Sequence, residues 1–196
     1  MNVDALVTEA RRLAERELAT ALPRRWRHVQ AVGQRAAEIV GTPAVDGDVL
    51  VAAAWLHDIG YAPELVASGF HPLDGARYLR RLGTVPDRVV GLVAHHSCAV
   101  IEAEERGLDR ELLAEFAREE SPTADALWYA DMTTGPDGQR FDIGERLAEI
   151  RARYGPEHVV TRFIDRAQGE IVTAVERTQV RLATQLNPLP VSERSS

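Results

Sequence analysis

Apolar residues recur at intervals of three and four positions along almost the whole chain. Leu6, Ala10 and Leu13 form the first series, and Val29 and Val32 begin the next one. This spacing gathers the apolar side chains on one face of an α-helix. No segment shows the strict alternation of apolar and polar residues that indicates a half-buried strand. The pattern therefore predicts an all-α fold, arranged as a single-domain helical bundle.

Residues that end or begin helices divide the chain into nine predicted helices. Four segments combine a helix stop with a proline suited to the first turn of the next helix: GTP at 41–43, TVP at 84–86, SPT at 121–123 and YGP at 154–156. The strongest loop signal is TTGPDGQ at 133–139. The predicted helices span residues 3–20, 24–40, 47–58, 72–82, 86–105, 109–118, 122–134, 142–153 and 157–185.

We assign residues 1–185 to one domain, in which residues 142–185 form the C-terminal helices. The last of these helices carries Ile164, Ile171 and Val175 on one face, which favours packing on the core over assembly with another chain. The final segment, residues 186–196, lacks apolar periodicity, so we predict a disordered tail.

Composition supports one domain and narrows the classes of partner. The chain has 196 residues, of which 45% are hydrophobic, enough for a core of ordinary size. Its net charge of -7 argues against sequence-independent binding to nucleic acid, although RRWRH at 24–28 is a local basic patch. Cys98 is the only cysteine, which excludes an intrachain disulfide and a thiolate-only zinc site.

We expect neither a signal peptide nor a membrane span. The first 20 residues carry charges every few positions and lack the apolar core of a signal peptide. No apolar stretch approaches the roughly 18 residues needed to span a bilayer. We therefore expect a soluble protein of the reducing cytoplasm, with no membrane or nucleic-acid partner. The sequence indicates no particular oligomeric state.

Side chains able to bind metals occur at the ends of the predicted helices. His28 lies near the start of the second helix, and His57 and Asp58 end the third. If these two helices pack antiparallel through their short connection, His28 faces this pair. Neighbouring helical residues point about 100° apart, so His57 and Asp58 cannot chelate one ion as a fork. A carboxylate can bridge two ions, which suits a two-metal site.

Three more positions complete the candidate metal shell. His71 stands at a helix start, where it can project back over the site. His95 and His96 are neighbours, so only one of them is expected to aim at the same centre. Asp131 and Asp125 compete as a further carboxylate. We favour Asp131, because an ionisable group at the buried end of an apolar run is costly unless it is paired or bound to metal.

The motifs around these residues resemble the HD-domain superfamily of metal-dependent phosphohydrolases. The resemblance covers approximately residues 22–135 and rests on WRHVQAVG, AAAWLHDIGY and WYADMTTG. It implies that the four defining metal ligands of the family are His28, His57, Asp58 and Asp131.

Two further histidines resemble the extra ligands of HD proteins that hold two metals. His71 in GFHPLDGARYLRRLG and His96 in VAHHSCA take these positions. Such proteins include diadenosine tetraphosphate hydrolases, HD-GYP cyclic-dinucleotide phosphodiesterases and diiron oxygenases. No GYP follows the paired histidines, which counts against the cyclic-dinucleotide branch. Histidine and carboxylate ligands suit one or two divalent ions of Mn, Fe, Co, Ni or Zn.

The predicted function is that of a metal-dependent phosphohydrolase or phosphodiesterase acting on a small, nucleotide-like phosphate ester. We assign proton transfer or phosphate contact to His95, and phosphate binding to Arg27, the arginine next to His28. Arg24 and Arg25 lie within the same turn. Two alternatives remain open: a diiron oxygenase with the same ligands, and a non-catalytic HD module for regulation or binding.

Overall fold

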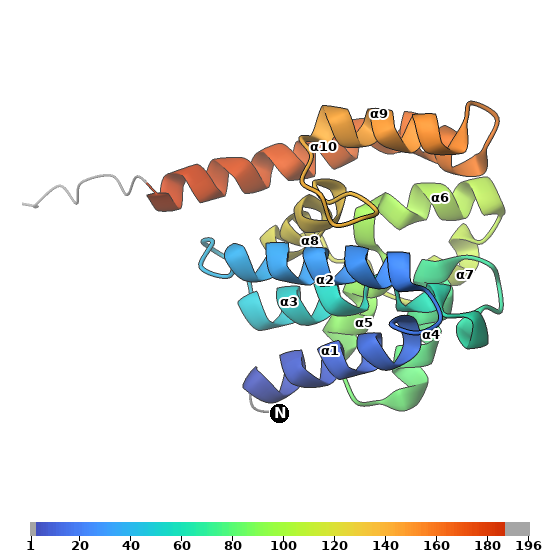
Figure 1. The fold of residues 1–196 in the computed structure, drawn as a ribbon, viewed down its shortest axis with the longest axis horizontal. Coiled ribbons are helices and arrows are strands. Elements are labelled where there is room, and N and C mark those ends of the chain that lie inside the picture. Colours follow the sequence, from blue (N-terminus) through green and yellow to red (C-terminus); the bar gives the residue numbers. More distant parts are fainter. Residues whose placement is uncertain (1–2, 187–196) are drawn as a thin grey trace, which may run out of the picture.

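The computed structural model describes residues 3–186, and all regular secondary structure in this range is helical (Figure 1). It contains no strand in the described range, only one isolated bridge between Thr134 and Arg140. The all-α prediction is therefore confirmed. The helices are α1 (Val3–Leu18), α2 (Pro23–Glu38), α3 (Gly47–Leu56), η1 (Ile59–Tyr61), η2 (Pro63–Leu65), α4 (His71–Leu82), α5 (Asp87–Ala94), η3 (His96–Cys98), α6 (Ala99–Arg106), α7 (Asp109–Glu115), α8 (Pro122–Met132), α9 (Ile143–Tyr154) and α10 (Val159–Leu186).

Helix α3 lies at the centre of the bundle. It packs against α1, α2, α5 and α8, and every residue from Leu50 to Leu56 is buried. Asp46 begins the helix by accepting a hydrogen bond from the Val49 amide, as an N-cap residue does. A helix that is apolar on all sides must be covered on all sides. Its end, where His57 and Asp58 follow, is therefore surrounded by other helices.

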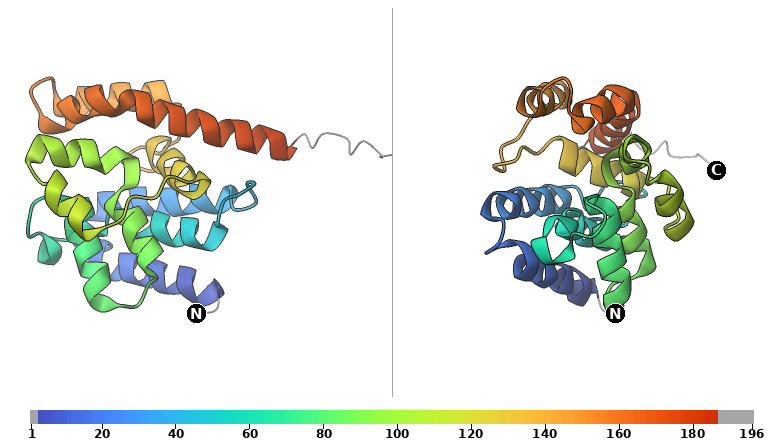
Figure 2. Two further views of the ribbon diagram at one scale, coloured as in Figure 1. Left: turned by 180° about the vertical axis from the view of Figure 1, so that it is seen from behind. Right: turned by 90° about the vertical axis from the view of Figure 1, so that its right-hand side faces the viewer.

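Helices α9 and α10 form an outer layer over α8 and α6 (Figures 1 and 2). Ile164, Ile171 and Val175 are buried in this contact, so the last helix packs on the core as predicted. No helix within residues 3–186 combines the length and the apolar character needed to cross a bilayer. Residues 187–196 lie outside the described range, and the disordered tail stays a prediction.

One predicted helix, residues 86–105, is in fact divided into α5, η3 and α6. Ser97 and Cys98 have φ angles of 46° and 62°, which interrupt the right-handed helix. The apolar pattern runs on because both flanking helices are buried, and neither glycine nor proline marks the break. The other eight predicted helices end within about three residues of their observed bounds.

Candidate metal centre

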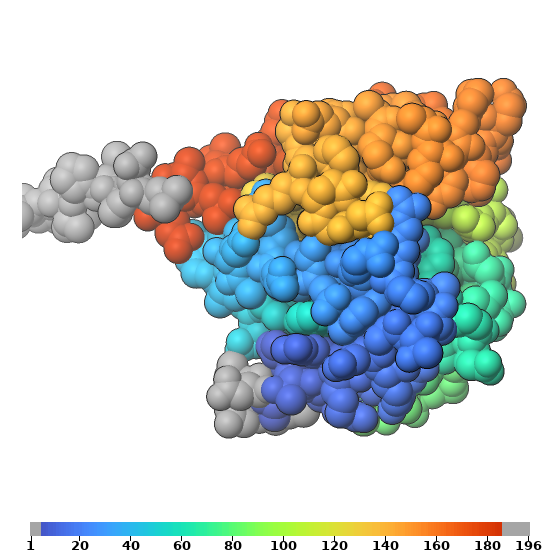
Figure 3. Space-filling view, in the orientation of Figure 1, coloured from blue at the N-terminus to red at the C-terminus, as the bar shows by residue number. Residues whose placement is uncertain are grey.

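Helix α2 carries His28 on its buried face. The Nδ1 atom of His28 lies 3.0 Å from the carbonyl oxygen of Gly135. A carbonyl oxygen only accepts, so Nδ1 carries the proton and donates it. The opposite ring nitrogen, Nε2, then faces Asp131 Oδ1 at 3.2 Å. The loop between α8 and α9, which supplies Gly135, lies against α2 (Figure 3).

His57 is oriented in the same way at the end of α3. Its Nδ1 atom donates to the carbonyl oxygen of Ala54 at 2.8 Å, one turn earlier in the chain. This bond turns Nε2 of His57 toward Nε2 of His28, at a distance of 3.3 Å. When both rings are neutral, each Nε2 atom carries a lone pair, and the two lone pairs point toward each other. Helices α2 and α3 thus bring His28 to the His57–Asp58 pair, as the antiparallel arrangement predicts.

A second histidine pair lies beside the first. His71 is the first residue of α4, and its Nε2 atom lies 3.2 Å from Nε2 of His96. His96 donates from Nδ1 to the carbonyl oxygen of Val93 at 2.7 Å. The interruption at Ser97 allows His96 to leave the line of α5. The ring of Tyr61 stacks on His71 with 4.0 Å between centroids and fixes its orientation.

Gly60 allows α4 to approach the end of α3. A Cβ atom at this position would lie 2.0 Å from the carbonyl oxygen of His71 and 2.6 Å from the amide nitrogen of Gly75. No side chain fits in that space. The glycine that ends the LHDIG motif therefore serves close backbone contact, and this contact places His71 near Asp58.

The polar atoms form two groups, each with three residues that could hold a metal ion: His28, His57 and Asp131 in one, and Asp58, His71 and His96 in the other. Within each group the ligand atoms lie within 4.8 Å of one another. Asp58 connects the groups, because its Oδ2 is 3.3 Å from His57 Nε2 and its Oδ1 is 3.3 Å from His71 Nε2. The structure brings all six predicted ligand residues together.

The charges at this centre favour a cation. Asp58 and Asp131 place two carboxylates in a buried site, and Arg25 pairs with Asp58 at 2.6 Å. Burial alone would lower the pKa of His57, but the carboxylates of Asp58 and Asp131 raise that pKa to about 9. The centre thus draws in positive charge. A divalent ion supplies this charge to oxygen and imidazole donors, so the residues fit such a metal.

Two of the other candidate ligands have the charge states that metal binding requires. Burial lowers the pKa of His96 to about 4, so its ring is neutral near pH 7. Burial opposes ionisation of Asp131, but the neighbouring side chains of His28 and His57 hold its pKa well below the usual range. The hydroxyl of Ser97 also donates to Asp131. Sequence reasoning missed Ser97, whose only signal is its place next to His96.

The structure does not place Arg27, the predicted phosphate ligand, beside the metal groups. Arg27 donates to Asp137 at 3.0 Å, and its side chain is 54% exposed. Arg25 faces the centre instead, through its bond to Asp58. Helical phase explains the difference. Arg25 precedes His28 by three residues and shares its face, whereas Arg27 is one residue away and about 100° around the helix.

The structure also places His95, the predicted proton-transfer or phosphate-contacting residue, outside both metal groups. Its Nε2 atom donates to the carbonyl oxygen of Phe116 at 2.9 Å, and His95 belongs to neither metal group. The backbone carbonyl of His95 accepts from the Trp128 indole. His95 and His96 point in different directions because the helix ends between them. His96 is therefore the member of the pair that joins the centre.

A cavity of about 80 Å³ opens beside the metal groups. Two arginines of α9, Arg146 and Arg153, line it together with Arg25. Arg146 is 5% exposed, and its Nε atom has no hydrogen-bond partner in the described part of the chain. Such a donor favours an anionic ligand. Sequence reasoning missed Arg146. Its signal is a position four residues before Ile150, on the apolar face of α9.

Comparison with known families agrees with this geometry. A family described as "HD domain" matches residues 25–134. The chain belongs to the HD domain family. The resemblance noted over residues 22–135 is thereby confirmed. No curated protein and no solved structure gave a significant match. The HD domain segment contains all six candidate ligands, whereas Arg146 and Arg153 lie beyond it.

Proposed function

We propose that this HD domain protein is a metal-dependent phosphohydrolase that acts on a small phosphate ester. The observation that carries the proposal is the position of two His/Asp groups beside a cavity lined by Arg25, Arg146 and Arg153. One cavity is thus bordered both by residues that can bind a cation and by guanidinium groups. Its ligand should be able to contact a metal ion and an arginine at the same time. A phosphoryl group is such a ligand, because its oxygens bind metal ions and accept paired hydrogen bonds from arginine.

The chain's own contribution is to orient the donors. His28, His57 and His96 each fix their ring by donating from Nδ1 to a backbone carbonyl, which aims Nε2 into the centre. Asp58 serves both groups with its two oxygens. When bound, divalent ions supply an activated water and neutralise negative charge on the phosphoryl group. Preorganised ligands avoid the cost of ordering these side chains during the reaction.

We assign to the arginines the binding of those phosphoryl oxygens that point away from the metal-binding residues. Within residues 3–186 the buried Nε donor of Arg146 has no partner, and Arg25 is held in place by its ion pair with Asp58 and by stacking at 4.1 Å over Tyr61. A buried guanidinium cannot lose its proton, so its charge persists at every working pH. We infer that Arg25 and Arg146, and not Arg27, bind the phosphoryl group.

The same ligands would serve a diiron oxygenase, and a regulatory HD module would keep them without chemistry. The three arginines at the cavity favour an anionic substrate, which supports hydrolysis of a phosphate ester. Oxygen consumption by the iron-loaded protein would support the oxygenase instead. Tight binding of phosphate esters without turnover would support the regulatory module.

The test combines metal analysis with hydrolysis of generic phosphomonoesters and phosphodiesters. We expect metal-dependent phosphate release by the protein loaded with Mn, Fe, Co, Ni or Zn, and its loss in Asp58→Asn, which keeps the shape of the side chain. Asp48→Asn, near the other end of α3, is the matched control and should retain activity. Full activity in metal-free protein or in Asp58→Asn would falsify the proposal.

A further inference from the structure

Asp131 presents its two carboxylate oxygens to different neighbours. Its Oδ1 lies 3.2 Å from Nε2 of His28 and 3.8 Å from Nε2 of His57, within the first metal group. Its Oδ2 accepts a hydrogen bond from the hydroxyl of Ser97. An ionised carboxylate only accepts hydrogen bonds, so the hydroxyl is the donor. One oxygen of Asp131 thus faces the candidate ligands of this group, and the other is held by Ser97.

Ser97 reaches Asp131 from a left-handed backbone conformation. Its φ is 46° and its ψ is 43°, and Cys98 follows with a φ of 62°. Residues that carry a Cβ atom seldom adopt such angles, which persist only where the surrounding structure holds them. Glycine adopts them without strain. What serine adds to this position over glycine is its hydroxyl.

Helix α8 anchors this turn at two points. The indole of Trp128 donates to the backbone carbonyl of His95 at 3.2 Å, and Asp131 accepts from Ser97. Trp128 and Asp131 are three residues apart and therefore share one face of the helix. Ser97 is 7% exposed. These contacts hold the hydroxyl against Asp131 and leave it little freedom to bond to solvent instead.

We propose that Ser97 is a positioning residue of the metal centre, whose hydroxyl holds Oδ2 of Asp131 so that Oδ1 is presented to a metal ion. The inference rests on the proposed function through the metal ion that this function requires. Ser97 itself belongs to neither metal group. It directly follows His96, so one strained turn supplies a candidate ligand to the second group and orients a candidate ligand of the first.

The experiment measures the affinity of the full-length protein for Co²⁺ alone, by competition with a chromophoric chelator. Ser97→Ala removes the hydroxyl and keeps the Cβ atom, and it should raise Kd about 10- to 100-fold. The visible absorption of the bound Co²⁺ should change as well, because it depends on the ligands and their geometry. Ser97→Gly adopts the left-handed angles freely and should show the same two changes without a folding defect.

Cys98→Ala is the matched control. It also removes one side-chain atom from a left-handed residue of the same turn. The thiol of Cys98 contacts Glu170 at 3.6 Å, and Cys98 is not part of either metal group. This variant should therefore keep the Kd and the absorption spectrum of the wild type. Thermal melts of the metal-free proteins verify that each variant folds.

Two results would overturn the role of Ser97 and leave the metal centre in place. One is a wild-type Kd and spectrum in Ser97→Ala and Ser97→Gly. The other is an equal loss of affinity in Cys98→Ala, which would trace the effect to the turn and not to the hydroxyl. Failure of the wild-type protein to bind Co²⁺ would overturn the metal centre and this inference together.

Discussion

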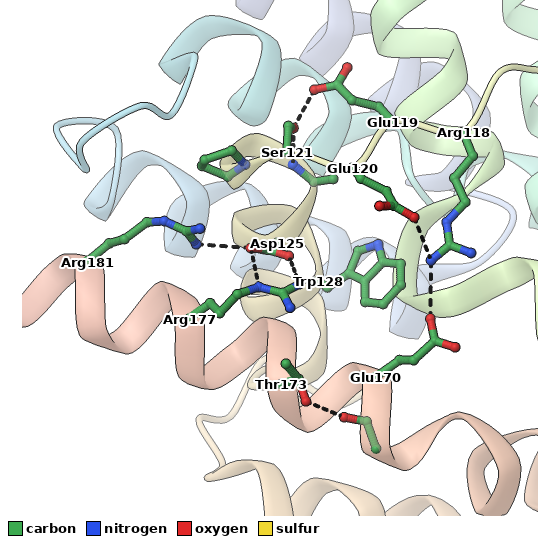
Figure 4. A pocket seen from close by; sticks show the side chains of 13 residues that line it. Arg118, Glu119, Glu120, Ser121, Asp125, Trp128, Glu170, Thr173, Arg177 and Arg181 are labelled. Atoms are coloured by element: carbon green, nitrogen blue, oxygen red, sulfur yellow. Dashed lines mark hydrogen bonds and ion pairs between the residues drawn. The ribbon is translucent and has the colours of Figure 1, made fainter.

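The metal centre differs in an instructive way from a groove between α8 and α10 (Figure 4). We define the groove by Arg118, Asp125, Trp128, Glu170, Arg177 and Arg181, which line it with their neighbours. The groove has a volume of about 530 Å³, whereas the cavity at the metal centre has about 80 Å³. Pocket volume alone would therefore select the groove, and not the metal centre, as the candidate site.

The pairing of charges separates the two regions. In the groove, Arg177 and Arg181 both donate to Asp125, at 2.8 and 3.0 Å, and Arg118 pairs with Glu170 at 3.1 Å. At the metal centre, imidazole nitrogens face one another and face carboxylates. The groove satisfies its polar groups internally and so stabilises the packing of α10 on α8. The facing nitrogens and carboxylates of the centre are instead arranged so that they could hold a cation, which we propose to be a metal ion.

A single helix contributes to both regions. Asp125 and Asp131 lie six residues apart on α8, so their side chains point about 120° apart around the helix axis. Both are buried carboxylates, at 8% and 7% exposure. Their burial does not distinguish them, and only their partners do. This makes the two residues a matched pair for testing the comparison.

The largest expected effect is on activity. Asp131→Asn should reduce hydrolysis of phosphate esters about 1,000-fold or more, because it removes a metal ligand that also anchors His28. Asp125→Asn should stay within about twofold of the wild type. Steady-state kinetics and metal content of the two purified proteins check this. Similar losses in both variants would assign the effect to the packing of α8 and contradict the proposed role of Asp131.

The next effect is on stability. In metal-free protein, Arg25→Met should lower the free energy of unfolding by about 3 kcal/mol, because it leaves Asp58 buried without its partner. Arg177→Met should cost only about 0 to 1 kcal/mol, since the Arg177 side chain is 51% exposed. Urea unfolding measures both values. Equal costs would show that the two ion pairs do not differ as their burial indicates.

Removal of metal gives a third comparison. At a free metal concentration 100 times Kd, binding should add about 2.7 kcal/mol to the free energy of unfolding, and a chelator should remove it. Asp125→Asn should keep this metal-dependent gain, and Asp131→Asn should lose most of it. Thermal melts with and without chelator provide the measurement. A gain that persists in Asp131→Asn would place the ion elsewhere.

The smallest effect is the pH response of the groove. Glu119 accepts hydrogen bonds from Arg88, which lower its pKa below the ordinary value of 4.5. The stabilisation is therefore present above pH 4.5 and is lost as the pH falls through the lower value in the folded protein. Glu119→Gln should weaken the acid sensitivity of the melting temperature in this range. If the melting temperature of Glu119→Gln fell with decreasing pH as it does in the wild type, the Glu119–Arg88 pair would make no contribution to stability.

The sequence predicts the helices and the family well because both depend on local pattern. Apolar periodicity locates the elements, and the HD motif with its upstream histidine carries a specific spacing. Five of the six candidate ligands, among them His28 and Asp131, also come from helix ends that the pattern identifies, whereas His96 lies inside the predicted helix 86–105. The structure brings these six together, although their binding of metal stays a prediction.

The remaining features depend on tertiary contacts that local pattern does not encode. The break at Ser97 has no glycine or proline to announce it, and the left-handed angles persist because surrounding contacts hold them. That Arg25 and not Arg27 faces the centre could have been predicted from their positions around the helix. The contribution of Arg146 could not be located, because it requires knowing that α9 folds back over the centre.

The hydrogen bond between His28 and Gly135 joins residues 107 positions apart in the chain. A contact of this range carries a large loop-closure entropy, which is repaid only when the intervening helices are packed. We therefore expect the centre to assemble at a late stage of folding. Partly folded chains hold the histidines too far apart to act together, so the metal affinity that we propose is expected only of the completed fold and would serve as a quantitative signal of correct refolding.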